Sequence, residues 1–361
     1  MNKQKIRVLV VDDSALIRKI LSDLLGQHPS IEVVGTAQDG SFVLSKIEQL
    51  KPDVITLDVE MRKTGGLEIL PQIVQKYNLP VIMVSAVTER GAEATFKALE
   101  LGAIDFVTKP HAGSPSGVQE IANMLAAKIV AVSRNKPDVK RQPSTGPLAR
   151  PSFRKAVDTA KPIPPRVATP SLNLNAIAIG ASTGGTEAIK EVLLNLPTNL
   201  PGIVIVQHMP AGFTKAFANR LDGLCKIHVK EAEDGDIVSP GTALIAPGDH
   251  HMEVNGTANN LRVRLQQSPP VNRHRPSVDV LFHSVAKKIG KKCLGVILTG
   301  MGGDGSQGLK AIRDQGAVTV AQDEESCVVF GMPKEAIKLN GASYVLPLSQ
   351  IGGFLVEAVN K

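Results

Sequence analysis

Strand-like apolar runs alternate with helix-like segments in two separate series, and this alternation restricts the fold more than any other feature. The first series has runs at 7–13, 32–37, 53–59, 80–86 and 103–110, and segments between them carry apolar residues at three- and four-residue spacing. The second series has runs at 175–185, 202–213, 242–254, 294–305 and 317–333. Alternating strands and helices form mainly parallel sheets with helices on both faces. The sequence therefore predicts two α/β domains.

A basic, proline-rich segment lies between the two series. Residues 134–170 contain nine Lys or Arg, two Asp and eight of the 24 prolines, so they account for the whole formal net charge of +7. Such a composition, without an apolar period, is typical of a solvated, semi-extended linker. We therefore predict a first domain at 1–125, a linker at 126–170 and a second domain at 171–361.

Composition argues against several classes of partner. The basic charge lies in the linker, and two Tyr with no Trp disfavour a base-stacking surface, so we expect no nucleic-acid partner. No apolar run approaches the roughly 18–20 residues of a membrane span, and the first run is expected to be a buried strand rather than a signal peptide. Three widely spaced cysteines fit a reducing compartment, so we expect a cytoplasmic protein without membrane insertion.

Polar residues follow the strands predicted for the first domain. They are Asp12 and Asp13, Asp58, Ser85 and Lys109. The carboxyl ends of parallel strands line the ligand crevice of such sheets, and three carboxylates gathered there favour a divalent cation.

These residues resemble a response-regulator receiver domain, which has a flavodoxin-like, doubly wound parallel sheet. The resemblance implies that Asp58 accepts a phosphoryl group from a chemotaxis histidine kinase. It implies an Mg²⁺ cofactor held by Asp13 and Asp58 with help from Asp12, phosphoryl contacts from Ser85 and Lys109, an aromatic switch residue at 106, and a cis bond before residue 110. The stretch MRKTGG at 61–66 departs from the family's loop pattern.

The second series opens with NAIAIGASTGG at 175–185, an apolar strand followed by a glycine-rich turn. Such a turn either binds phosphate at a helix start or presents a serine nucleophile. No acidic residue lies near 200–208, where a dinucleotide fold would need one, and the lysine of a Walker loop is absent. As a nucleophile, Ser182 needs a base and an acid at other strand ends, and His208 and Asp304 occupy such positions. The order Ser, His, Asp differs from that of the α/β-hydrolases.

Four separated motifs, GASTGG, QHMPxGFT, RPSVDVLF and TGMGxDG, together with the receiver, resemble the chemotaxis protein-glutamate methylesterases/protein-glutamine glutaminases (the CheB family). The resemblance implies a C-terminal α/β methylesterase domain with a mainly parallel sheet. It implies Ser182 as nucleophile, His208 as base, Asp304 as the acid that orients the histidine, and no cofactor for this site. It also implies methyl-ester hydrolysis and glutamine deamidation on the cytoplasmic helices of chemoreceptors.

Several assignments stay open at this point. The backbone N–H groups of Thr183 and Met301 are candidates for the oxyanion hole, and Arg275 either contacts substrate or forms a structural ion pair. Other histidines (His250, His251, His274 and His283) are interpreted as groove or surface residues rather than zinc ligands, and Cys327 as a packed thiol. The alternative functions are a nucleotide-binding output domain without catalysis and, disfavoured by the confined charge, a DNA-binding output domain.

Overall fold

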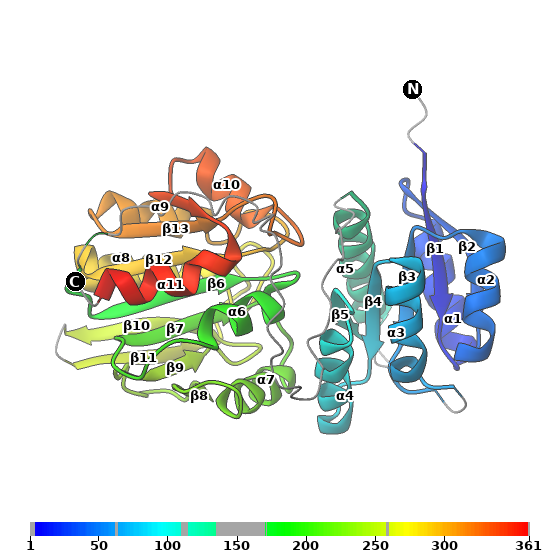
Figure 1. The fold of residues 1–361 in the computed structure, drawn as a ribbon, viewed down its shortest axis with the longest axis horizontal. Helices are drawn as coiled ribbons and strands as arrows, with labels where there is room; N and C mark the ends of the chain where they lie inside the picture. Colours follow the sequence, from blue (N-terminus) through cyan, green and yellow to red (C-terminus); the bar gives the residue numbers. More distant parts are fainter. Residues whose placement is uncertain are drawn as a thin grey trace, which may run out of the picture.

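The computed structural model describes residues 4–61, 64–109, 115–134, 170, 172–257 and 260–359. Most of the predicted linker and the proline at 110 lie outside these residues. The two domains lie side by side, with the N-terminal domain in blue and cyan at one end and the C-terminal domain at the other (Figure 1). No helix among the described residues is long and apolar enough to cross a membrane.

The N-terminal domain is a doubly wound parallel sheet with strand order β2-β1-β3-β4-β5. Its strands are buried, and helices α2, α3 and α4 cover one face while α1 and α5 cover the other. The elements are β1 (Ile6–Val11), α1 (Ala15–Gly26), β2 (Ile31–Ala37), α2 (Val43–Leu50), β3 (Val54–Asp58), α3 (Gly66–Tyr77), β4 (Val81–Ser85), α4 (Glu89–Glu100), β5 (Asp105–Thr108) and α5 (Pro115–Arg134). Helix α5 thus continues beyond residue 125, the predicted domain end.

The C-terminal domain contains a seven-stranded parallel sheet with strand order β14-β13-β12-β6-β7-β9-β8. Its strands are β6 (Ala176–Ala181), β7 (Gly202–Gln207), β8 (His228–Glu231), β9 (Thr242–Ile245), β12 (Cys293–Ile297), β13 (Val318–Gln322) and β14 (Tyr344–Leu346). Its helices are α6 (Gly185–Leu193), α7 (Phe213–Asp222), α8 (Val278–Ile289), α9 (Ser306–Asp314), α10 (Met332–Lys338) and α11 (Leu348–Val359). The predicted α/β fold class is confirmed for both domains.

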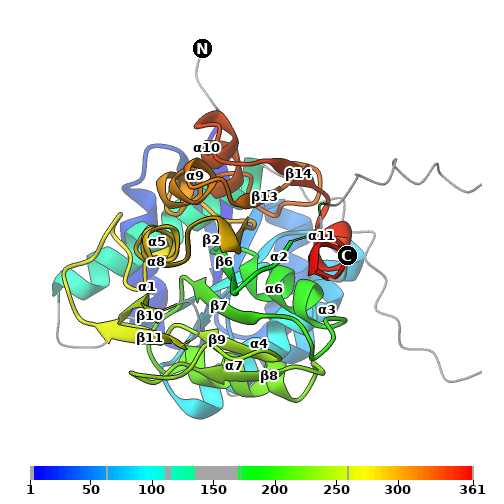
Figure 2. The same ribbon diagram turned by 90° about the vertical axis from the view of Figure 1, so that its left-hand side faces the viewer.

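The helices of the C-terminal domain divide between the two faces of this sheet. Helices α6, α7 and α11 pack on one face, and α8, α9 and α10 pack on the other (Figure 2). An antiparallel hairpin of β10 (His251–Thr257) and β11 (Asn260–Gln266) joins the second group. The range 242–254 is predicted as an apolar run that ends in a polar loop, but after the turn it also holds the start of a second strand, so that it divides between β9 of the main sheet and β10 of the hairpin. The turn at Pro247–His250, with Asp249 at φ +65°, separates the two strands.

Aromatic rings join the two domains where α4 meets α7. Phe106 at β5 stacks on Phe213 with 4.7 Å between ring centroids, and Phe96 of α4 stacks on Phe217 at 5.6 Å. Beside these rings, Glu100 of α4 forms an ion pair with Arg220 of α7 at 2.5 Å. Stacked aromatic pairs with a partly buried ion pair form a specific contact, so the face of the N-terminal domain that carries α4 and β5 is the face that meets the C-terminal domain.

Candidate functional site

Three adjacent strands bring Ser182, His208 and Asp304 to one edge of the C-terminal sheet. Strand β6 lies between β12 and β7, and Ser182 directly follows β6 while His208 directly follows β7. The backbone N–H of Ser182 donates to Thr299 after β12 at 3.0 Å, and the N–H of His208 donates to Ala181 at 3.2 Å. The chain winds in opposite directions from β6, so the three residues lie at a topological switch point, where open α/β sheets bind ligands.

The turn after β6 presents Ser182 at the start of a helix. Gly184 has a φ of +76°, and a Cβ placed there would lie 2.6 Å from Val328. Glycine meets both requirements, because it adopts a left-handed conformation without strain and leaves room for the neighbouring side chain. The N–H of Gly185 then donates to the carbonyl oxygen of Ser182 at 2.7 Å. The local structure is the strand–turn–helix that the sequence predicted around the serine.

The carboxylate of Asp304 accepts hydrogen bonds from every side. It lies at the N-terminus of α8, where its negative charge is stabilised by the helix dipole. Its donors are Val278 N–H at 2.7 Å, Asp279 N–H at 3.2 Å, Ser277 Oγ at 2.7 Å, Asn272 Nδ2 at 2.7 Å and His208 Nε2 at 2.8 Å. Such a set of donors fixes both the charge and the orientation of this buried group.

Electrostatics at Asp304 assign the proton on His208. Burial alone would raise the pKa of Asp304, but the hydrogen bonds from His208, Asn272 and Ser277 and the interaction with the His208 ring outweigh it and hold that pKa below its usual range. The ionised carboxylate therefore accepts the Nε2 proton of His208. The other ring nitrogen, Nδ1, is buried and has no hydrogen-bond partner among the described residues. Its lone pair is thus available to accept a proton.

A second histidine covers the ring of His208. His274 stacks on it with 3.7 Å between ring centroids and 13° between ring planes. Burial, followed by the charge that His208 can carry, lowers the pKa of His274 to about 3, so this ring is neutral near pH 7. A neutral ring in this position excludes water from one face of His208 without adding a competing positive charge.

The remaining candidates for this site have different surroundings. The backbone N–H groups of Thr183 and Met301 have no acceptor among the described residues, which leaves them available to an oxyanion. Arg275, by contrast, binds Asp249 through Nε at 3.0 Å and Nη2 at 2.5 Å, and its Nη1 donates to the Ser268 carbonyl. The structure therefore gives Arg275 an internal ion pair.

Carboxylates also gather at the switch point of the N-terminal sheet. Asp12, Asp13 and Asp58 each offer an oxygen within 4.8 Å of the others, a donor set that suits a hard divalent cation such as Mg²⁺. Lys109 Nζ lies 2.7 Å from Asp58 and 3.1 Å from Asp12. Ser85 is buried and donates to the Gly91 carbonyl at 3.1 Å, so its hydroxyl is directed toward α4 in this structure.

Burial makes Asp58 an unusual carboxylate. It raises the pKa of Asp58 to about 6, although the hydrogen bond from Lys109 acts in the opposite direction. Desolvated carboxylates are more reactive nucleophiles once positive charge is present to keep them ionised. Asp58 therefore has the environment of a phosphoryl acceptor, with Lys109 as the adjacent positive charge.

Sequence reasoning missed two residues that contact the triad. Asn272 and Ser277 both donate to Asp304 from about 30 residues earlier in the chain. The motif RPSVD gave a local signal, because Ser277 begins α8, but no pattern related this turn to the loop after β12. His251, interpreted as a groove or surface residue, is fully buried and accepts from Ser277 N–H. Burial raises the pKa of Cys327 to about 12, as expected for a packed thiol.

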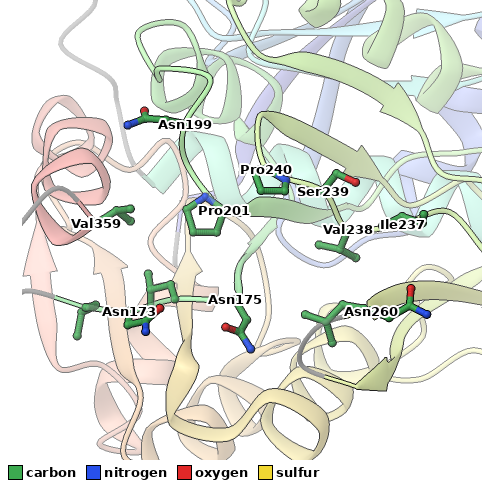
Figure 3. A pocket seen from close by; sticks show the side chains of 13 residues that line it. Asn173, Asn175, Asn199, Pro201, Ile237, Val238, Ser239, Pro240, Asn260 and Val359 are labelled. Atoms are coloured by element: carbon green, nitrogen blue, oxygen red, sulfur yellow. The ribbon is translucent and has the colours of Figure 1, made fainter.

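A cavity of about 650 Å³ lies at the amino ends of the strands of the C-terminal sheet, whereas the triad lies at their carboxyl ends. Figure 3 shows the side chains that line this cavity. It is lined by residues that precede strands, including Asn175 before β6, Pro201 before β7 and Pro240 before β9. Ligand crevices of open α/β sheets form at the carboxyl ends of strands, and this cavity is at the amino ends. The triad and not this cavity is therefore the candidate active site.

Comparisons with known proteins show which families the two parts of the chain match. The model of the CheB methylesterase family matches residues 177–355, and that of the response regulator receiver domain matches residues 8–116. The protein-glutamate methylesterase/protein-glutamine glutaminase of Salmonella typhimurium is 51% identical over 99% of this chain and 97% of its own length. A second such protein, from Cupriavidus pinatubonensis, is 51% identical over 96% of this chain and 94% of its own length. The crystal structure of the Thermotoga maritima CheB methylesterase catalytic domain aligns with a TM-score of 0.50 at 44% identity, covering 52% of this chain and all of that one.

Proposed function

The chain belongs to the CheB methylesterase family and carries a receiver domain, and from this premise we propose how its residues perform and control the reaction. It is a protein-glutamate methylesterase and protein-glutamine glutaminase under phosphorylation control. The alternative of a nucleotide-binding output domain is not favoured. We propose that its substrates are γ-glutamyl methyl esters and glutamines on the cytoplasmic helices of chemoreceptors, so that it acts in the cytoplasm.

The proposed triad rests on one observation: His208 Nε2 lies 2.8 Å from the Asp304 carboxylate, while Nδ1 has no hydrogen-bond partner among the described residues. With the ring proton on Nε2, Nδ1 is the base for the Ser182 hydroxyl. Nδ1 removes the proton of the Ser182 hydroxyl as its oxygen attacks the ester or amide carbonyl. The protonated ring next gives this proton to the leaving methoxide oxygen or amide nitrogen as its bond to carbon breaks, so that methanol or ammonia departs. The acyl-serine is then hydrolysed by a water activated in the same way, which releases glutamate.

The oxyanion of each tetrahedral intermediate needs donors close to Ser182. We propose the backbone N–H groups of Thr183 and Met301 for this role, because neither has an acceptor among the described residues and both lie next to the serine. A Cβ added at Gly300 would lie 2.9 Å from the Cβ of Ser182, so the loop that carries Met301 is in direct contact with the serine. Arg275 could contact a substrate carboxylate either beside its ion pair with Asp249 or by replacing that ion pair.

For the receiver domain, we propose that Asp58 takes the phosphoryl group from a chemotaxis histidine kinase. Asp13 and Asp58, with Asp12, would hold Mg²⁺, and the ion would supply positive charge that offsets the negative charge of the incoming phosphoryl group. Lys109 already forms an ion pair with Asp58, so its ammonium group can contact the oxygens of a phosphoryl group on that residue. Ser85 would have to release Gly91 to reach them, which links phosphorylation to a change at α4.

We propose two domains joined by a linker, with the receiver extended to Arg134. The residues of α5 after position 125 support this extension, since Ala126, Ile129 and Val132 are buried in the receiver core. The catalytic domain would begin near residue 171, where the chain approaches β6.

We further propose that the unphosphorylated receiver covers the approach to Ser182. Val329 is buried in the same apolar cluster as α5, and Met301 and Val328 pack against that cluster. Val328 also adjoins Gly184 in the serine turn. On the other side, Phe106 stacks on Phe213, which lies five residues after His208. A change at β5 or α4 can therefore be transmitted directly to the loops of the active site.

Reversing one charge at the domain contact is expected to activate the unphosphorylated chain. Arg220→Glu places a carboxylate opposite Glu100 and weakens the contact by repulsion. Methanol release from methylated receptor membranes should rise roughly threefold to tenfold, equivalent to about 0.7–1.4 kcal/mol. The double variant Glu100→Arg/Arg220→Glu should restore most of the inhibition.

The matched control is Lys310→Glu, a charge reversal on α9, which lies away from the receiver (Figure 1). It should leave the basal rate unchanged. Equal rates for Arg220→Glu and the unaltered chain would contradict occlusion through this face.

A further inference from the structure

Asn272 occupies a two-residue turn beside the triad. Val271 and His274 exchange backbone hydrogen bonds of 3.1 and 2.9 Å, and the two residues between them, Asn272 and Arg273, have φ values of +53° and +67°. Such a turn requires the left-handed conformation at both positions, which asparagine adopts more readily than most residues. The turn thereby directs the Asn272 amide toward the N-terminus of α8.

The amide nitrogen of Asn272 joins two buried carboxylates. It lies 2.7 Å from Asp304 Oδ1 and 2.8 Å from Asp279 Oδ2. The two hydrogens on this nitrogen allow both bonds to form at once. Asp304 and Asp279 are only 2% and 6% exposed, so solvent screens them weakly from each other.

Two carboxylates in such surroundings compete for ionisation. Burial raises the pKa of Asp279, and the nearby charge of Asp304 adds to this, while the Gly308 N–H and Asn272 act against it. By reciprocity, Asp279 disfavours the ionised form of Asp304. The shared amide donates to both acids at once, and among the described residues it is the one side chain that favours the ionised form of each.

We propose that Asn272 is a positioning residue of the active site, whose amide keeps Asp304 ionised and aimed at His208 in spite of the neighbouring Asp279. The inference rests on the proposed triad and adds a residue outside it. Asn272 acts through Asp304 and does not touch the reacting atoms.

Anchoring of the loop does not account for these bonds, because other residues hold the loop already. His251 Nδ1 accepts from Ser277 N–H at 3.1 Å, and His251 Nε2 lies 3.2 Å from the Pro269 carbonyl oxygen. The ring therefore contacts both ends of the loop that carries Asn272. Arg275 adds its ion pair with Asp249. The hydrogen bonds from the Asn272 amide to the two carboxylates are therefore not needed to hold the loop in place.

Two variants distinguish the effect of the Asn272 amide from the effect of the turn conformation. Asn272→Gly removes the donor while keeping a residue that adopts positive φ without strain. Because a hydrogen bond to a charged group is lost, kcat for methanol release should fall about ten- to a hundredfold with KM little changed. Asn272→Asp keeps the shape and adds a third carboxylate, so its loss should be larger.

The pH profile distinguishes a charge effect from a structural one. In Asn272→Asp the added negative charge favours protonated forms of the site, so the acid limb of kcat/KM should move to higher pH. The charged or titratable groups around Asp304 and Asp279 are His208, His274, His283 and Lys128, and none of them is altered in this variant. A merely structural role would lower the rate at every pH without moving the limb.

The controls and outcomes are as follows. Asn340→Asp changes another asparagine with positive φ (+57°), remote from the triad, and should leave both kcat and the limb unchanged. In Asn272→Asp/Asp279→Asn an amide again joins residues 272 and 279, but Asp304 still lacks its donor, so activity should stay low. Recovery in this double variant, or wild-type kcat in Asn272→Gly, would overturn the proposal. If Ser182→Ala retained activity, the proposed triad itself would fail instead.

Discussion

Ser182→Ala is expected to lower the rate of methanol release roughly 10⁶-fold, as removal of a triad nucleophile does in serine hydrolases. The physical reason is that the acyl-serine can no longer form, while His208 and Asp304 remain in place. Within the part of the chain that the structure describes, the hydroxyl has no hydrogen bond that alanine would break, since the bonds at this position are made by the backbone of Ser182. Methanol release from methylated receptor membranes measures the effect.

Labelling by a serine-reactive fluorophosphonate gives an independent readout. The unaltered catalytic domain should be labelled at Ser182, and the alanine variant should not be labelled while keeping its circular dichroism spectrum. Ser45→Ala removes an exposed serine on α2 and should change neither result. Near wild-type turnover in Ser182→Ala would refute the acyl-enzyme mechanism.

Asp304→Asn should lower kcat about 10⁴-fold with little change in fold. The carboxylate accepts from five donors, and an amide cannot accept on its nitrogen. If that nitrogen faces His208, Nε2 must become an acceptor and the ring proton moves to Nδ1. The base is then blocked at the atom that must take the serine proton.

This variant has a control on α9, the helix that follows Asp304 in the chain. Asp314→Asn removes a carboxylate paired with Lys310 at the far end of α9, and kcat should stay within about twofold of the unaltered enzyme, since exposed ion pairs contribute little. A modest loss in Asp304→Asn, comparable with that of Asp314→Asn, would show that Asp304 does not set the tautomer of His208.

Much of the fold could be predicted from the alternation of apolar runs, because strands buried on both faces are continuous apolar segments. The order of the strands could not be predicted, since no local pattern says that β12 lies beside β6 after more than a hundred residues. Strand β10 was missed after the polar turn at 247–250, because only two apolar residues, Met252 and Val254, alternate with polar ones in it. His251, at the start of β10, was consequently placed outside the core.

The sequence also indicated which side chains follow the strands, and the structure brings Ser182, His208 and Asp304 to neighbouring strand ends. It could not indicate which nitrogen of His208 meets Asp304, because this depends on the approach of α8 to the loop after β12. Asn272 was missed for the same reason, since its contacts join a turn to the first turn of α8 and to the loop after β12. Nor could a pattern show that Phe106 stacks on a ring of the other domain.

Methanol release by the intact chain, measured with and without beryllofluoride in the presence of Mg²⁺, tests the account most directly. Beryllofluoride mimics a phosphoryl group on Asp58. Such a group adds negative charge and acceptor oxygens that draw Lys109 and Ser85 and change the face at α4 and β5. The rate should rise by about 5- to 150-fold, the range of typical coupling between sites. The mimic should have no effect on Asp58→Ala or on a fragment that begins near residue 171, and this fragment should already exceed the basal rate of the intact chain. Equal basal rates for the fragment and the intact chain, or activation of Asp58→Ala by the mimic, would contradict control by a receiver that covers Ser182.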